Sequence, residues 1–381
     1  MERSDPAGRG SVAPCGALNL DELEARARMR LTRDVYDYYA GGAEDEVTLR
    51  ANRAAYASLA LRPRVLVDVS AIDVSVELLG KRLPHPILLA PTAFQRLAHE
   101  EGELAVARAA RQTGAVLVAS SLSTYTIEEI AAAPAGELWF QLYVFRDRGL
   151  SAELVRRAEA AGARALCVTV TVPVQGRRER DARNAFGLPQ DLEMANFRGL
   201  EQAGFPDGGG SRLERFIGRQ FDPSLDWSAL EWLRSVTTLP ILLKGIMTPE
   251  DARLAAEHGA AGVIVSNHGG RQLDSAEPTI AALPRIAQSV AERLPVLIDG
   301  GIRRGTDVLK ALALGARAVL IGRPYLWGLA AGGESGVAQV VAFLRAELER
   351  VMAMTGCRSL DEVGPGLITP TRVLDHGRLE T

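Results

Sequence analysis

Val263–Asp274 read V-I-V-S-N-H-G-G-R-Q-L-D, and this stretch predicts the fold. Residues 263–265 form a β-branched apolar run that is typical of a fully buried strand. The run stops abruptly in a polar cluster that carries Ser266, Asn267, His268 and Arg271. Barrel enzymes carry their reactive side chains at the carboxyl ends of such strands, so the stretch predicts a parallel α/β barrel.

His268 and Arg271 suggest acid–base chemistry beside an anion site. A histidine can take a proton near neutral pH, and an arginine grips a carboxylate through two parallel hydrogen bonds. Gly269 and Gly270, which lack a Cβ, allow a sharp turn and a close approach to a flat ligand. The same four residues also fit an ordinary strand-end turn with a solvated histidine and arginine, so the rest of the chain must decide.

The composition limits the class of protein. The 381 residues are 47% hydrophobic, which allows a large core, and a net charge of −3 does not favour a nucleic-acid surface. We find no apolar stretch of membrane-spanning length and no secretion signal, so we expect a soluble, cytoplasmic protein without a membrane partner. No metal site is expected, because the three cysteines are widely spaced: Cys15, Cys167 and Cys357.

From residue 87 onward the chain repeats a short apolar strand, a polar or glycine-rich turn and a helix. Strands are expected at 87–90, 116–119, 138–142, 165–170, 241–243, 262–265, 296–298 and 318–321. Helices are expected at 101–113, 127–132, 152–161, 249–258, 280–293 and 306–314. This alternation over about 235 residues predicts a (β/α)8 TIM barrel of the α/β class. A doubly wound sheet is not favoured, because no G-x-G-x-x-G turn follows the first strand.

Three further segments lie outside this repeat. Residues 1–17 are expected to form a disordered tail, and residues 18–381 a single barrel domain. Helices between residues 19 and 59 and a hairpin at Gly80-Lys81 predict an N-terminal helical cap that plugs the bottom of the barrel. The connection after the fourth strand, about 172–238, is too long for a simple crossover and contains Gly208-Gly209-Gly210. We predict that this insertion is a lid, a mobile cover over the active site.

Residues that directly follow the strands should meet at one rim of the barrel. Gln141, Lys244, His268 and Asp299 come from four different strands and are poor choices for packing. Their convergence favours a functional site over a set of solvated turns. One interpretation of this rim is an aldolase that uses Lys244 as a Schiff base.

The last two strands end in D-G-G-I-R-R and I-G-R-P, in the loops where barrels commonly bind a phosphate. Arg303 and Arg323 are therefore candidate phosphate ligands, although both also fit as ordinary surface arginines. Lys244 would then lie beside the ring of a cofactor, where a buried ammonium group stabilises negative charge.

Eight motifs between residues 20 and 361 resemble one family. They are V-Y-D-Y-Y-A-G-G-A-E-D (35–45), A-P-T-A (90–93), F-Q-L-Y (140–143), G-R-R-E (176–179), L-K-G (243–245), S-N-H-G-G-R-Q-L-D (266–274), D-G-G-I-R-R-G (299–305) and I-G-R-P (321–324). The chain resembles the FMN-dependent 2-hydroxy-acid oxidases and dehydrogenases, which include glycolate, lactate and mandelate oxidases.

The resemblance implies a role for each matching residue. His268 corresponds to the catalytic base, and Arg271 to one ligand of the substrate carboxylate. Arg178 and Tyr38 match the other carboxylate contacts, and Tyr143 matches the tyrosine that contacts the substrate oxygen. The positions that match the FMN-binding set are Ala93, Ser120, Gln141, Thr169, Lys244, Ser266, Asp299, Gly300, Gly301, Arg303, Gly322 and Arg323.

Two positions depart from the family pattern. The aspartate that holds the catalytic imidazole is replaced by Thr171, which supplies no charge to stabilise an imidazolium. Three explanations stay open, namely a slow enzyme, a substitute acid such as Asp181, or a changed reaction. Glycolate-type members have a tryptophan where this chain has Leu122, so a wider pocket and a bulkier substrate are expected.

The resemblance implies FMN-dependent oxidation of an (S)-2-hydroxy acid, bulkier than glycolate, to the 2-oxo acid, with O2 as acceptor and H2O2 as product. A dehydrogenase with another electron acceptor, and a flavin enzyme that tailors a larger natural product, are the alternatives. The partners expected are the small-molecule acid, the acceptor and further copies of the chain in a homotetramer.

Overall fold

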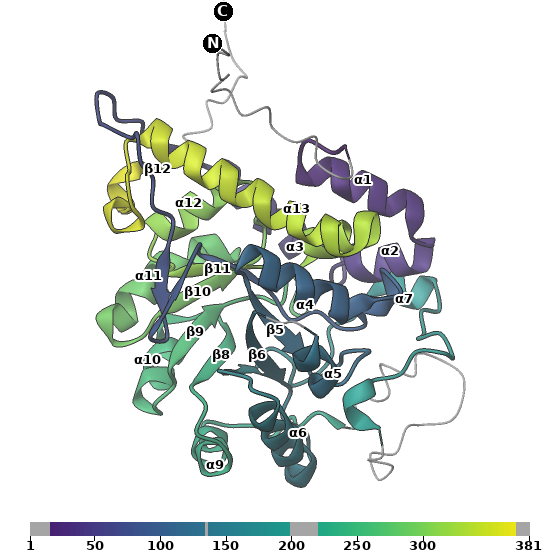
Figure 1. The fold of residues 1–381 in the computed structure, drawn as a ribbon. Helices are drawn as coiled ribbons and strands as arrows, with labels where there is room; N and C mark the ends of the chain where they lie inside the picture. Colours follow the sequence, from purple (N-terminus) through teal and green to yellow (C-terminus); the bar gives the residue numbers. More distant parts are fainter. Residues whose placement is uncertain (1–15, 134–135, 199–219, 371–381) are drawn as a thin grey trace, which may run out of the picture.

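The computed structural model describes residues 16–133, 136–198 and 220–370. Eight parallel strands form a closed barrel with helices around it, as Figure 1 shows. The barrel strands are β4 (Ile87–Leu89), β5 (Val116–Ser120), β6 (Glu137–Leu142), β7 (Leu166–Thr169), β8 (Ile241–Ile246), β9 (Gly262–Val265), β10 (Val296–Asp299) and β11 (Ala318–Ile321). The predicted (β/α)8 barrel is therefore confirmed, with every strand within a few residues of its expected position.

The strands follow one another around the barrel in chain order, and β11 closes it by pairing with β4 through Val319 and Ile87. Helices cover the outside of the barrel (Figure 1). They are α4 (Gly102–Thr113), α5 (Ile127–Ala132), α6 (Arg148–Ala160), α9 (Ser228–Val236), α10 (Pro249–Glu257), α11 (Thr279–Val290) and α12 (Gly305–Ala313). Each helix follows a strand, which is the right-handed crossover arrangement that parallel strands require.

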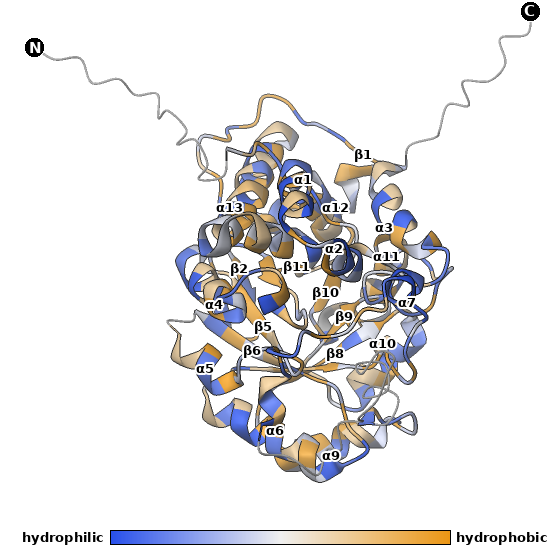
Figure 2. Cartoon of the chain, turned by 90° about the vertical axis from the view of Figure 1, so that its right-hand side faces the viewer, coloured by the Kyte–Doolittle hydropathy of each residue, from blue (hydrophilic) through white to orange (hydrophobic). Residues whose placement is uncertain are grey.

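Alternation along the strands decides which side chains reach the active site. Successive strand residues point to opposite faces, so one set lies inside the barrel and the other packs under the helices. Val118, Trp139, Cys167 and Leu297 belong to the inner set and are buried together. Two residues further along the same strands, this set ends in Ser120, Gln141, Thr169 and Asp299. Hydrophobic residues therefore fill the barrel, and polar side chains gather at its carboxyl mouth. The barrel strands are mostly orange, and so hydrophobic, in Figure 2.

The predicted hairpin plugs the bottom of the barrel. It consists of β2 (Val76–Leu78) and β3 (Lys81–Leu83), which pair antiparallel. Val76, Leu78 and Leu83 join the buried cluster of inner strand residues. They lie beside the first residues of β5 and β6, at the amino end of the strands.

The prediction that the N-terminal helices also plug the bottom is wrong. The helices are α1 (Leu20–Arg30), α2 (Arg33–Ala40) and α3 (Val47–Ala57), and α2 and α3 reach the opposite, carboxyl rim. The backbone N–H groups of Val47 and Thr48 donate to the Asp274 carboxylate at 3.1 and 2.8 Å. This carboxylate caps the N-terminus of α3 across 226 residues of chain, a long-range contact that local patterns do not reveal.

The C-terminal part of the chain adds a long helix that was not predicted. α13 (Arg323–Thr355) packs against α1, α4 and α12 and bends at Gly332 and Gly333, whose backbone angles are not helical. Beyond α13, β12 (Ile368–Pro370) pairs antiparallel with β1 (Leu59–Leu61).

The two segments predicted to be mobile are only partly described. Residues 1–15 of the expected tail lie outside the described residues, but Ala17 is buried and its carbonyl accepts a hydrogen bond from Gln339 Nε2. The predicted tail boundary was therefore too late. The insertion contains α7 (Glu179–Arg183), the 3₁₀ turn η2 (Ala195–Phe197) and the barrel helix α9. Gly208-Gly209-Gly210 lie outside the described residues, so the lid stays a prediction. Among the described helices, none combines the length and the apolar character needed to cross a bilayer.

Candidate active site

A cavity opens at the carboxyl mouth of the barrel. Gln141 and Ser266 are the two sequence-predicted site residues that stand behind its wall. The others line it: Tyr38, Ala93, Ser120, Tyr143, Thr169, Arg178, Lys244, His268, Arg271, Asp299, Gly300, Gly301, Arg303, Gly322 and Arg323. The structure thus brings together residues from the first fifty positions, from the insertion and from all eight barrel strands or the loops that follow them.

His268 is held in an unusual backbone conformation just after β9. Its φ is +57°, in the left-handed region that a side chain rarely adopts. Its backbone N–H donates to Ser266 Oγ at 3.1 Å, and its ring Nδ1 lies 2.8 Å from Thr171 Oγ1. When Nδ1 carries the ring hydrogen and donates it to this hydroxyl, Nε2 is left free to accept a proton.

The surroundings of His268 keep the imidazole neutral. Burial lowers the pKa of His268 well below its usual value, and the charges of Lys244, Arg178, Arg271 and Arg323 lower it further. A neutral imidazole can act as a general base over the whole neutral pH range.

Thr171 is the hydrogen-bond partner that the structure gives to Nδ1. Its methyl group fits beside Gly245, where a Cβ would come within 2.3 Å of Thr171 Cγ2. The carboxylate of Asp181, considered above as a substitute, lies 3.9 Å from Arg178. In this structure the hydroxyl group of Thr171 therefore occupies the position beside His268 where the family pattern has an aspartate.

Two guanidinium groups form an anion site next to His268. Arg271 Nη1 donates to the carbonyl oxygens of Tyr38 at 2.6 Å and of Gly41 at 2.9 Å, and its guanidinium stacks over the Tyr38 ring. Burial, followed by the charge of Arg178, lowers the pKa of Arg271 to about 10. Arg178 Nε is buried and has no hydrogen-bond partner. Two buried cations that repel each other are stabilised by an anion between them, as a substrate carboxylate would be.

Two phenols complete the substrate side of the cavity. Tyr38 stacks on Phe186, with ring centroids 4.3 Å apart, and Tyr143 stacks on Phe221 at 4.5 Å. Burial raises the pKa of both Tyr38 and Tyr143. Both hydroxyl groups therefore stay protonated at neutral pH and can donate to substrate oxygens.

The barrel mouth offers a row of polar groups for a flat heterocycle. Lys244 Nζ contacts Asp299 Oδ2 at 2.6 Å and donates to Ser266 Oγ at 2.8 Å. Gln141 Nε2 donates to Thr169 Oγ1 at 3.0 Å. Asp299 Oδ1 is buried without a partner, so it requires a donor from a ligand.

The loops after β10 and β11 offer an anion site. Gly300 and Gly301 have φ of +96° and +82°, and a Cβ on Gly301 would lie 2.0 Å from the carbonyl oxygen of Asn52. Arg303 Nε is buried without a partner. Arg323 contributes charge, but three of its N–H groups already donate to the carbonyl oxygens of Tyr39, Gly269 and Gly41. Backbone N–H groups, two cations and a glycine cradle together suit a phosphate.

Several cavity residues were not predicted from the sequence. Tyr39 lines the cavity, and its hydroxyl donates to the carbonyl oxygen of Phe94 at 2.7 Å. Phe221 and Val172 form part of the apolar wall. Tyr39 directly follows a predicted site residue in a quoted motif, which could have revealed it, whereas Phe221 carries no local signal.

The comparisons with known proteins agree with this geometry. Residues 27–370 match the model of a family described as FMN-dependent dehydrogenase. The chain belongs to this family. It is 51% identical to glycolate oxidase 3 of Arabidopsis thaliana and 50% identical to glycolate oxidase of Spinacia oleracea, each over 91% of this chain and 94% of the relative.

Solved structures of mandelate oxidase are also similar. The structure with (S)-4-hydroxymandelic acid has a TM-score of 0.88 and 45% sequence identity, covering 93% of this chain and 98% of that one. The chain is thus an FMN-dependent oxidoreductase of the 2-hydroxy-acid oxidase type. The flavin-free aldolase alternative is overturned.

FMN fits the groups at the barrel mouth. The polar row of Lys244, Asp299 and Gln141 suits the edge of the flavin ring and the ribityl hydroxyls. The glycine cradle with Arg303 and Arg323 suits the phosphate. The partnerless Asp299 Oδ1 and Arg303 Nε are the buried atoms that such a ligand would satisfy.

Proposed function

We propose that this protein oxidises an (S)-2-hydroxy acid larger than glycolate to the 2-oxo acid and passes the electrons to O2, giving H2O2. The observation that carries the proposal is the placement of a neutral imidazole, two guanidinium groups and two phenols around one cavity with an FMN-compatible mouth.

The cavity orients the acid and removes one proton. Arg271 and Arg178 hold the substrate carboxylate, and Tyr38 donates a hydrogen bond beside them. The substrate hydroxyl then faces His268, whose Nε2 takes its proton, while Tyr143 donates to a substrate oxygen. Bound FMN would supply the two-electron acceptor for this oxidation, and the electrons would pass from it to the final acceptor. The imidazolium loses its proton to solvent or to the reduced acceptor, so each turnover removes two hydrogens from the acid.

Thr171 limits how well the site stabilises the protonated base. An aspartate at this position would supply a negative charge beside the imidazolium, whereas a hydroxyl supplies a dipole only. The four charged side chains that most affect the pKa of His268 are all cations. The site therefore suits acids whose α-hydrogen is already activated, for example by an adjacent aromatic ring.

The apolar wall supports a substrate larger than glycolate. Leu122 is 4% exposed and lines the cavity together with Val172 and Phe221. A second cavity shares Tyr143 and Phe221 with the first and is lined mainly by aliphatic side chains, including those of β7, β8 and α9. A branched aliphatic wall accommodates an aryl or alkyl group, for which glycolate has no counterpart.

The test is anaerobic mixing of the purified holoprotein with glycolate, (S)-lactate, (S)-mandelate and (S)-2-hydroxyoctanoate, while the loss of the visible flavin absorbance is recorded. We expect bleaching by each reactive acid, with kcat/KM higher for mandelate or hydroxyoctanoate than for glycolate. A clear preference for glycolate would refute the size proposal, and no bleaching by any acid would refute the reaction. Adding O2 and assaying peroxide then tests the acceptor.

Thr171 favours a second candidate, a flavin enzyme that tailors a larger natural product. The weaker base is tolerable when a large substrate supplies binding energy from groups remote from the reacting carbon. Failure of all four simple acids to bleach the flavin, with retained FMN binding, would favour this candidate.

A further inference from the structure

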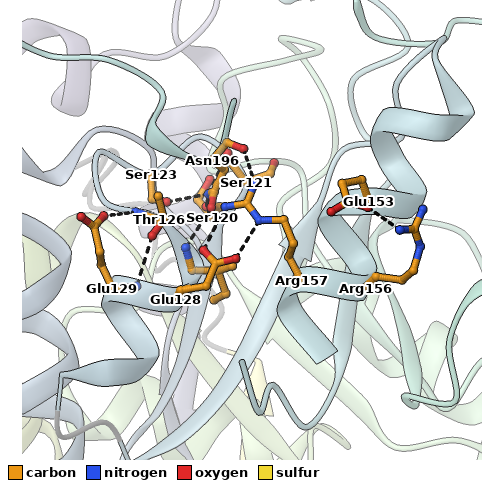
Figure 3. A network of polar contacts seen from close by, with 11 residues as sticks. Ser120, Ser121, Ser123, Thr126, Glu128, Glu129, Glu153, Arg156, Arg157 and Asn196 are labelled. Atoms are coloured by element: carbon orange, nitrogen blue, oxygen red, sulfur yellow. Dashed lines mark hydrogen bonds and ion pairs between the residues drawn. The ribbon is translucent and has the colours of Figure 1, made fainter. Parts of the chain in front are cut away.

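The insertion after β7 makes a buried contact with the loop after β5 through Asn196 in η2. Asn196 is 0% exposed, and Figure 3 shows it directed at the serine-rich loop that follows β5. Its Nδ2 donates to Ser123 Oγ at 2.9 Å and lies 3.2 and 3.4 Å from the carbonyl oxygens of Ser121 and Ser120. One amide group thus contacts three acceptor oxygens, at the end of β5 and in the loop that follows it.

The other end of the same amide is fixed as well. Asn196 Oδ1 accepts a hydrogen bond from the backbone N–H of Ile127 at 2.9 Å, at the first residue of α5. Because that N–H can only donate, the oxygen of the amide must face it, and the Nδ2 group must face the serines. A backbone hydrogen bond from Ala195 N–H to the Ser123 carbonyl, at 3.0 Å, adds to the attachment.

Asn196 holds the end of β5 and the loop that follows it, and these carry two residues of the cavity. Ser120 and Leu122 both line it. Ser120 Oγ donates to Gln141 Oε1 at 3.2 Å and accepts the backbone N–H of Leu122 at 3.1 Å. Gln141 in turn donates to Thr169. A shift of the loop would therefore move a side chain of the FMN site and the apolar wall together.

The outer side of η2 is attached independently of the amide. Arg157 of α6 donates through Nη1 to the backbone oxygen of Asn196 at 2.7 Å. Its Nε and Nη2 pair with the two carboxylate oxygens of Glu128 at 2.7 and 2.9 Å (Figure 3). This outer contact stabilises η2 without touching the serine loop, and it provides a matched control.

We propose that Asn196 is a positioning residue for the active site. Its amide fixes the loop after β5, so that Ser120 meets FMN and Leu122 sets the size of the substrate pocket. The part that concerns Leu122 rests on the proposed function, whereas the part that concerns Ser120 rests on the FMN site alone.

The test compares three variants of the holoprotein. N196D keeps the volume and the acceptor for Ile127 but replaces the donor to the serines by an oxygen. S123A removes the shortest contact of Asn196 Nδ2 without adding charge, and it carries the test where N196D does not fold. R157Q removes the outer contact only. The readouts are the Kd for FMN, the visible flavin spectrum, the melting temperature and the ratio of kcat/KM for mandelate to that for glycolate.

We expect N196D to raise the Kd for FMN about tenfold, to shift the flavin spectrum and to change the substrate ratio about fivefold, with S123A smaller in the same direction. R157Q should lower the melting temperature while leaving Kd and ratio within about twofold of the parent protein. The proposal is overturned if N196D and S123A lower the melting temperature alone, or if R157Q changes Kd and ratio as much as they do. If neither mandelate nor glycolate reduces the flavin of the parent protein, the proposed function fails. The FMN affinities of the variants still decide the role of Asn196.

Discussion

At the residue scale, the departure at Thr171 has the clearest chemical consequence. T171D would place a carboxylate beside His268 Nδ1, which raises the pKa of His268 and stabilises its protonated form. We expect flavin reduction to accelerate about tenfold or more. We also expect the acid limb of the kcat/KM profile to move to higher pH, since the base must be neutral to react.

The parent protein sets the baseline for this measurement. Because burial and four cations depress the pKa of His268, its kcat/KM should stay level as pH falls from 8 to about 6.5, and decline only below that. T171V, which loses the hydroxyl without gaining charge, serves as the control and should slow the reaction without moving the limb upward. An unchanged pH profile in T171D would contradict this account of the site.

Arg178 and Arg271 form the anion site that we expect to bind the substrate carboxylate. R178L should lower kcat/KM for 2-hydroxy acids about a hundredfold or more, because a buried charge-assisted hydrogen bond is lost. The neighbouring Arg177 is the matched control, since its side chain is 78% exposed and that of Arg178 is 10% exposed. R177L should leave steady-state kinetics unchanged, and equal losses in both variants would place the anion site elsewhere.

Single residues were predictable where a motif joined reactive groups in a fixed order. His268, Arg271 and Gly300 could be named because their neighbours in sequence are also their neighbours in the cavity. Phe221 and Asn196 could not, because each acts through a partner that lies far away in the chain. No local pattern encodes such a contact.

At the scale of the elements, the turn after β10 makes the sharpest prediction. G301A would place a Cβ 2.0 Å from the Asn52 carbonyl oxygen at a φ of +82°. Both the clash and the backbone conformation oppose the change, so we expect a loss of roughly 2 kcal/mol or more in stability together with weaker FMN binding.

Thermal unfolding and FMN titration measure these two effects. Gly364 offers a matched control, because a Cβ there meets nothing within 4 Å and its φ is −154°. G364A should therefore behave like the parent protein. Tight FMN binding by G301A would show that the cradle is not needed.

The strands were predictable as elements because most are short, fully buried apolar runs that end in a polar turn, as in β5, β9 and β11. α13 was missed because Gly332 and Gly333 interrupt its pattern and because its first residue belongs to the predicted phosphate loop. The bounds of α6 were four residues late at the start, since the side chain of Asp147 caps the helix earlier than the apolar pattern begins.

At the scale of the whole molecule, the two ends of the barrel have different roles. The amino end, closed by the hairpin, contributes to stability, and the carboxyl end carries the candidate active site. L78A should lower the free energy of unfolding by about 2–5 kcal/mol, because it leaves a cavity in the buried layer between hairpin and barrel. Leu78 is remote from the cavity at the carboxyl mouth, so the KM and the Kd for FMN should not change.

Glu77 lies on the same strand with its side chain exposed, so E77A is the control and should unfold like the parent protein. Chemical denaturation of the FMN-saturated protein measures the difference. A changed KM in L78A would mean that the two ends of the barrel are coupled.

The class of fold could be predicted because the strand–helix unit recurs along the chain, but the location of the N-terminal helices could not. Their attachment depends on the Asp274 carboxylate and on the reciprocal side-chain hydrogen bonds between Asn52 and Asn267. Both contacts join residues more than two hundred positions apart.

The hairpin at the amino end of the strands also restricts how substrate and product reach and leave the cavity. In the described part of the chain, Val76, Leu78 and Leu83 fill that end of the barrel, so we expect the acid to arrive, and its keto product to depart, through the opposite opening. Both molecules carry a carboxylate, and we expect Arg178 and Arg271 to attract it in each case. A product that stays bound at this opening excludes the next substrate. The rate of product release therefore sets an upper limit on turnover.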